Sequence, residues 1–180
     1  MSDTASAIAP GIRGRAVFGA ACARALALIL GAAQAHAAAT NDADATFLQK
    51  AAQANAAEIK TSQTAQTRAA NPAVKAFADR MVDEHTANEH ALEAIAKKRS
   101  VAVSADPDPD RQIRIGSLQK LKGVAFDHAY VTMMIGDHAA SISLFENAAR
   151  VVQDAEIRQF IDATLPLLRE HAEAAKALPH

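Results

Sequence analysis

The chain has 180 residues, half of them hydrophobic, 4% aromatic and 22% charged, with a formal net charge of −1. So few aromatic residues, with alanine supplying much of the apolar fraction, exclude a β-rich protein and favour an all-α domain of closely packed helices. The sequence also has no basic stripe and almost no aromatic platform, which argues against a nucleic-acid partner.

Residues 1–39 have the features of a secretory signal peptide. Arginines precede the apolar run at residues 25–33, and small residues follow at the spacing of a cleavage site. We therefore predict export to the periplasm and, because the run is too short to cross a bilayer, no membrane span after cleavage. An uncleaved anchor is the alternative, although Arg24 interrupts the longer apolar stretch. The single cysteine, Cys22, lies in this segment, so no disulfide is expected in the mature chain.

Residues 40–180 are predicted to form one helical domain. Glycine, proline and capping residues divide it into helices at about residues 47–67, 72–99, 110–122, 126–152 and 154–178. The long loop around Pro107 and Pro109, together with the short third helix, provides enough chain for a crossover between two helical hairpins. This connectivity predicts a ferritin-like four-helix bundle with a short extra helix in the crossover. The alternative is a simple four-helix bundle in which the short helix is an addition and forms no crossover.

Each long helix places one ionisable residue on its apolar stripe, where inward positions recur about every 3.5 residues. These residues are Glu58, His85, His138 and His171. Burying such a group without a partner costs several kcal/mol, so we expect the four to meet at one level of the bundle. His90 and His128 fall outside the stripes and are expected to face solvent.

Three imidazoles and a carboxylate suit zinc, copper or iron. Met81 and Met134 stand one turn from inward histidines and are weaker candidate ligands that would favour copper, and Asp137 is a third weaker candidate. A carboxylate di-iron site is not predicted, because no acid stands three residues before an inward histidine. The alternative is a buried, hydrogen-bonded Glu–His network that sets the helix register.

An acidic residue directly precedes each inward histidine: Glu84, Asp137 and Glu170. Successive residues point about 100° apart around a helix. These acids are therefore expected either to support a histidine on a neighbouring helix or to face solvent.

Four segments carry a resemblance to a known family: FLQKAAQANAAEIKTSQTA, VKAFADRMVDEHTANEHALEAIAKK, AFDHAYVTMMIGDHAASISLFENAA and FIDATLPLLREHAEAA. Over about residues 44–178 the chain resembles the bacterial domain of unknown function 4142. The resemblance implies a ferritin-like bundle in an exported, usually periplasmic protein that is often labelled an outer-membrane protein, and it implies no established activity. The four inward ionisable residues fall at motif positions of that family.

The residues support three hypotheses for function. The first is metal handling or stress protection through a transition metal in the bundle core. The second is a non-catalytic structural or interaction module of the cell envelope. The third is a metal-dependent oxidase, which would need an open coordination position. Neither a nucleophile–base pair nor a phosphate loop is present to support a hydrolase or a nucleotide-binding protein.

Overall fold

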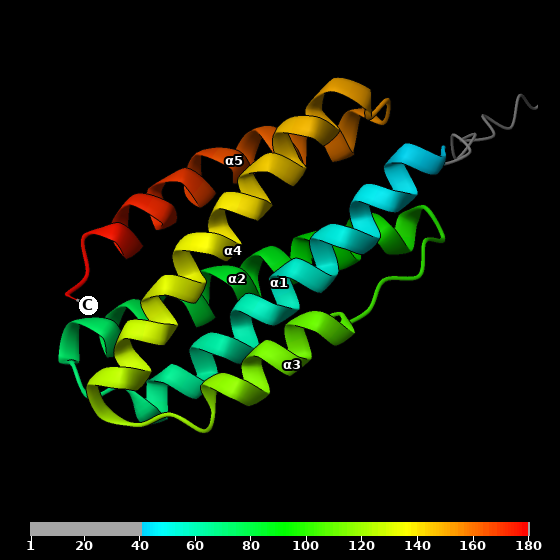
Figure 1. Ribbon diagram of the computed structural model, residues 1–180. Helices are drawn as coiled ribbons and strands as arrows, with labels where there is room; N and C mark the ends of the chain where they lie inside the picture. Colours follow the sequence, from blue (N-terminus) through cyan, green and yellow to red (C-terminus); the bar gives the residue numbers. More distant parts are fainter. Residues whose placement is uncertain (1–40, 180) are drawn as a thin grey trace, which may run out of the picture. The chain divides into compact units, whose positions relative to one another are not determined.

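The structure, a computed structural model, describes residues 41–179, so the predicted signal peptide lies outside the described residues. The described chain contains five helices and no strand, which confirms the all-α prediction. Figure 1 shows α1 (Asp42–Arg68), α2 (Pro72–Lys98), α3 (Pro109–Leu118), α4 (Gly123–Val151) and α5 (Ala155–Lys176).

The helix boundaries follow from capping and backbone conformation. The first helix begins earlier than predicted, at Asp42, because the Asn41 side chain accepts the Asp44 N–H and caps the helix. Gly123 was expected to end a helix, but it is the first residue of α4, where its φ of +59° suits glycine. The last long helix contains Pro166 and continues through it without a break, as the predicted single helix requires.

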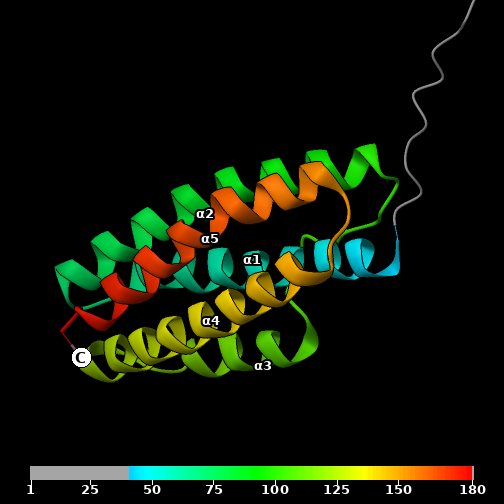
Figure 2. The same ribbon diagram turned by 90° about the horizontal axis from the view of Figure 1, so that it is seen from above.

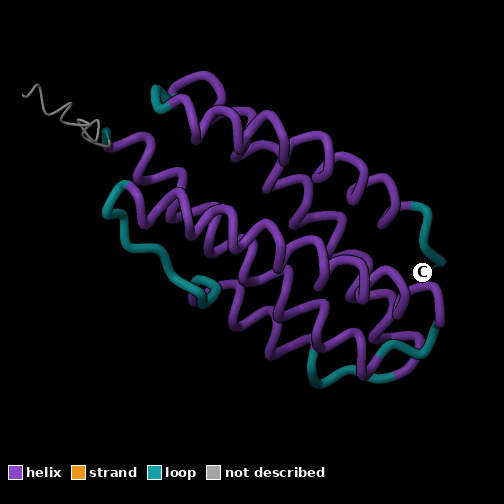
Figure 3. Tube along the Cα trace, turned by 180° about the vertical axis from the view of Figure 1, so that it is seen from behind, coloured by secondary structure: helices purple, strands orange, loops and turns teal. Residues whose placement is uncertain are grey.

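The four long helices form two hairpins joined by the crossover. α1 packs against α2 and α4 packs against α5, while α1 also contacts α4 and α2 contacts α5. Figure 2 shows α3 outside this bundle, alongside α4, and Figure 3 shows the longer loop that leads from α2 into α3. The arrangement is the predicted ferritin-like bundle with a short helix in the crossover.

Each hairpin holds the turn of the other through a buried aspartate. Asp44 of α1 accepts the N–H of Gln153 in the turn between α4 and α5, at 3.0 Å. Asp127 of α4 accepts the N–H groups of Ala70 and Asn71 in the turn between α1 and α2, at 3.0 and 2.8 Å. Asp127 follows Asp44 by as many residues as Gln153 follows Ala70, so the two contacts occupy corresponding positions in the two hairpins.

The bundle core consists of two hydrophobic clusters along its length. One contains the edge-to-face pair Phe47 and Phe145, whose ring centroids lie 5.0 Å apart. The other contains Tyr130, Met81 and Met134, all fully buried. None of the inward ionisable residues belongs to either cluster. Among the described residues, no helix is long and apolar enough to cross a membrane.

Candidate metal centre

The structure brings together the four ionisable residues predicted from helix phase. Glu58 of α1, His85 of α2, His138 of α4 and His171 of α5 are at most 2% exposed. The three imidazole rings form a nearly equilateral triangle, with centroids 5.6, 5.3 and 5.3 Å apart. One nitrogen from each ring lies within 4.8 Å of the others, so the three buried histidines are close enough to bind one metal ion.

The tautomer of His85 is set by Asn55, one helix away. The Asn55 Nδ2 donates to the backbone carbonyl oxygen of His85 at 2.9 Å, which turns its Oδ1 toward the ring. The Nδ1 of His85 lies 2.8 Å from that Oδ1 and must donate its proton to it. In the neutral ring, Nε2 therefore carries a free lone pair.

The tautomer of His138 is set by its own helix. Its Nδ1 lies 2.9 Å from the carbonyl oxygen of Met134, which can only accept. The proton therefore sits on Nδ1, and in the neutral ring Nε2 has a free lone pair. A backbone carbonyl partner of this kind commonly fixes the orientation of a metal-binding histidine.

The orientation of His171 depends on the acid that precedes His85 in the sequence. The Nε2 of His171 lies 2.5 Å from Oε2 of Glu84, so it donates to the carboxylate and leaves Nδ1 unprotonated. Arg80 donates to the other oxygen of Glu84 and to Glu170, both at 2.7 Å. Glu84 thus supports a histidine on a neighbouring helix, one of the two roles expected for these acids.

Glu58 directs one carboxylate oxygen toward the histidines. Its Oε1 accepts a hydrogen bond from Ser141 at 2.9 Å. Its Oε2 lies 2.8 Å from the Nε2 of His85 and 3.4 Å from the Nε2 of His138, both at ion-pair distance. Burial raises the pKa of Glu58, but His85 and His138, when they carry a proton in place of a metal, outweigh this effect and hold the pKa well below its ordinary value.

Three histidine nitrogens lie within 4.8 Å of one another in the bundle interior, and the Glu58 Oε2 approaches two of these histidines, His85 and His138. Four atoms of these residues are almost inaccessible to solvent and have no hydrogen-bond partner among the described residues: Glu58 Oε2, His85 Nε2, His138 Nε2 and His171 Nδ1. Burial lowers the pKa of His171, with repulsion from the other two histidines adding to the effect, which favours its neutral form. Lone pairs that face one another repel unless a metal ion or a proton lies between them.

The spacing of these atoms suits a transition metal. Two ligand atoms at about 2.0–2.1 Å from a shared ion are roughly 3–4 Å apart. The Glu58 oxygen lies within this range from His138, at 3.4 Å, and slightly below it from His85, at 2.8 Å. The histidine nitrogens, up to 4.8 Å apart, would have to move about 1–2 Å closer together to reach this spacing.

A family model described as Domain of unknown function (DUF4142) matches residues 30–178. The chain belongs to the DUF4142 family. A solved structure described as a DUF305 fragment from Deinococcus radiodurans shares the fold, with a TM-score of 0.69 and 12% sequence identity. The similarity covers 76% of this chain and 95% of that one. No curated protein matches the chain.

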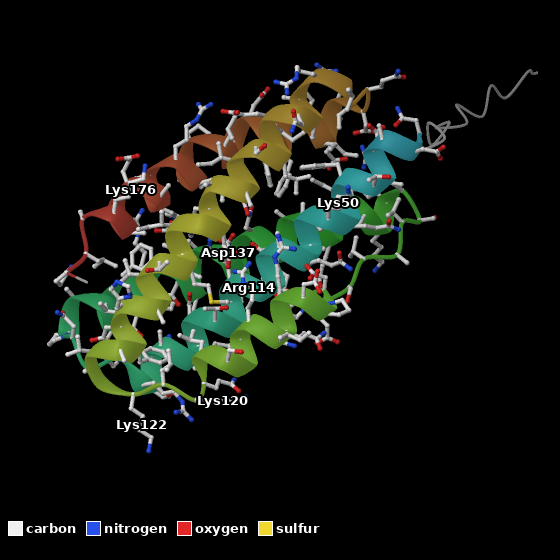
Figure 4. The ribbon with its side chains drawn as sticks, in the orientation of Figure 1. Lys50, Arg114, Lys120, Lys122, Asp137 and Lys176 are labelled. Carbon is white, nitrogen blue, oxygen red and sulfur yellow. The ribbon has the colours of Figure 1, made fainter. Side chains whose placement is uncertain are left out.

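The three weaker candidate ligands of this DUF4142 domain have other identifiable contacts. Met81 and Met134 are fully buried in a hydrophobic cluster, and the Met134 sulfur lies 3.9 Å from the Ser62 hydroxyl. Asp137 pairs with Arg114 of α3, and Figure 4 shows the two side chains close together. Both line a groove of about 750 Å³ between α3 and α4. Burial raises the pKa of Asp137, and the Arg114 guanidinium opposes that shift.

Sequence reasoning missed several residues that orient the DUF4142 centre. Asn55, Ser141 and Arg80 each hold a member of the centre or its supporting carboxylate in place. Asn55 stands three residues before Glu58, and Ser141 stands three residues after His138. A polar residue one helical turn from an inward ionisable residue was therefore the signal that could have identified them. The predicted exposure of His90 and His128 is confirmed.

Proposed function

We propose that this protein is an exported, periplasmic metal-binding bundle that holds one transition metal ion through Glu58, His85, His138 and His171. Its role would be metal handling or protection against metal or oxidative stress in the cell envelope. The supporting observation is a set of buried atoms without hydrogen-bond partners: one nitrogen on each of three histidines that lie within 4.8 Å of one another, and the Oε2 of Glu58. Such atoms are costly to bury unless a cation satisfies them.

The residues around the centre support metal binding more than a purely structural role. Each histidine donates its other nitrogen proton to an amide, carbonyl or carboxylate oxygen. This is the usual support of metal-binding imidazoles, because it fixes the tautomer that offers a lone pair to the ion. Three imidazole nitrogens and one carboxylate oxygen suit zinc, copper or iron.

The second candidate is a buried Glu–His network that binds a proton in place of the metal. The observation in its favour is the 2.8 Å distance from Glu58 Oε2 to His85 Nε2, where a shared proton would be stable. In that case, replacing Glu58 and His85 together by leucine should maintain or raise the Tm, because well-packed apolar residues often replace a buried ion pair without loss, whereas His85→Leu alone should lower the Tm by leaving Glu58 without its partner.

Metal content and thermal stability distinguish the two candidates. We would purify the protein without a histidine tag, remove metal with a chelator, and titrate zinc, copper and iron separately. One equivalent should bind. At about 100 times the Kd, the ion should add about 2.7 kcal/mol of stability and raise the Tm by roughly 10 °C.

Matched alanine variants on α2 identify the site. His85→Ala should abolish the metal-dependent shift in Tm, whereas His90→Ala, at an exposed position of the same helix, should retain it. Less than a tenth of an equivalent of each metal, with no shift in Tm, would contradict metal binding and favour the proton-bound network.

A further inference from the structure

A small cavity lies directly against the candidate metal centre. Its volume is about 10 Å³, close to the space that one water molecule needs. Two members of the centre, Glu58 and His85, form part of its wall. A ligand in this cavity would therefore lie beside the atoms that bind the metal.

The cavity occupies one side of the layer formed by the four candidate ligands. Its wall includes the residues one helical turn from that layer in a single direction: Ala54, Asn88, Ser141 and Leu168. On the other side, one turn away, the fully buried Met81 and Met134 belong to a hydrophobic cluster. The space next to the centre is thus on the side of Asn88.

Two polar groups in the cavity wall can hold a small ligand. The Oδ1 of Asn88 accepts a hydrogen bond from the Thr164 hydroxyl at 3.2 Å, which leaves the amide Nδ2 of Asn88 as a donor. The Ser141 hydroxyl donates to Glu58 and retains lone pairs that can accept. The rest of the wall is mainly apolar and includes Leu92, Phe145 and Leu168.

We propose that the metal centre keeps one coordination position for an exogenous ligand of one or two heavy atoms, of which this cavity holds one. Water or hydroxide, dioxygen and peroxide belong to this class. An organic substrate is too large to reach the metal by this path. The inference rests on the proposed metal site, and it adds a ligand position that a closed, purely structural centre would lack.

The test uses the cobalt(II)-loaded protein, because the visible spectrum of cobalt(II) reports its coordination. Under nitrogen, cyanide is the two-atom probe and imidazole is a probe too large for the cavity. Cyanide should change the spectrum while the protein retains its cobalt, and imidazole at the same concentration should not. If cobalt binds but the spectrum does not respond to cyanide, the ligand position is refuted and the metal site stands.

Variants in the cavity wall locate the response. Ala54→Val should fill the cavity and abolish the cyanide response without changing cobalt stoichiometry. Ala65→Val, the same change at a buried position of α1 outside the cavity, should retain the response. Asn88→Leu removes the amide donor and should weaken cyanide binding about tenfold.

Each further outcome decides one of the two proposals. A normal cyanide response in both Ala54→Val and Asn88→Leu would overturn the cavity assignment. Failure of the wild-type protein to bind cobalt, zinc, copper or iron would refute the metal site and the ligand position together. If Ala54→Val does not fold, the response of Asn88→Leu decides alone.

Discussion

Replacing Glu84 by glutamine should weaken metal binding by changing the tautomer of His171. Arg80 donates to Oε1 of Glu84, while the Oε2 accepts from the His171 Nε2. A glutamine has only one oxygen, and Arg80, which can only donate, will hold it. The glutamine amide then points its N–H toward Nε2 of His171, so the ring proton moves to Nδ1, the nitrogen that would bind the metal.

The size of this effect follows from the position of Glu84 outside the ligand set. Loss of a partner that orients a metal-binding histidine typically costs 10–100-fold in affinity. We therefore expect the Kd of Glu84→Gln to be about 10–100-fold higher than that of wild type, which is a loss of about 1.4–2.7 kcal/mol of binding free energy. The other members of the centre keep their hydrogen bonds, so one equivalent of metal should still bind.

The assay is a competition titration of the metal against a chelator of known affinity. Glu170→Gln is the matched control, because Glu170 shares Arg80 but has no contact with the His171 ring. It should leave the Kd within about twofold, as expected for an exposed ion pair. In the double variant Arg80→Met with Glu84→Gln, the glutamine can turn its oxygen to His171 and part of the affinity should return. Wild-type affinity in Glu84→Gln would refute the tautomer argument.

Two further predictions concern the turns that set the helix positions. Asp127→Ala leaves the N–H groups of Ala70 and Asn71 without their partner and should lower the free energy of unfolding, measured in urea, by about 2–4 kcal/mol. A change below about 0.5 kcal/mol would argue against this role of Asp127. The Arg99 guanidinium beside Asp154 holds the pKa of that carboxyl below its usual value. Its stabilising contribution should be complete above the unfolded pKa, near pH 4, and should disappear as the pH falls through the lower folded pKa. The difference in unfolding free energy between wild type and Asp154→Asn should therefore shrink below about pH 4, and a difference independent of pH would exclude this ion pair as its source.

The sequence determined the helices and the inward position of the four ionisable residues. Both depend on local information: alanine content, capping residues such as Asn71, and the position of each side chain around its own helix axis. His85 and His90 are five residues apart on one helix, and phase alone separates the buried residue from the exposed one. The start of α1 was the main local error, because Asn41 was not recognised as a cap.

Only the tertiary structure decided which atoms of these residues face one another. Helix phase does not specify the level at which helices meet or their rotation, so it could not distinguish Nδ1 from Nε2 in His171. It also left open whether Glu84 supports a neighbouring ligand or faces solvent. Those outcomes depend on partners contributed by other helices, such as Asn55 for His85 and Glu84 for His171. A pattern within one helix contains no information on such contacts, which arise only when the bundle packs.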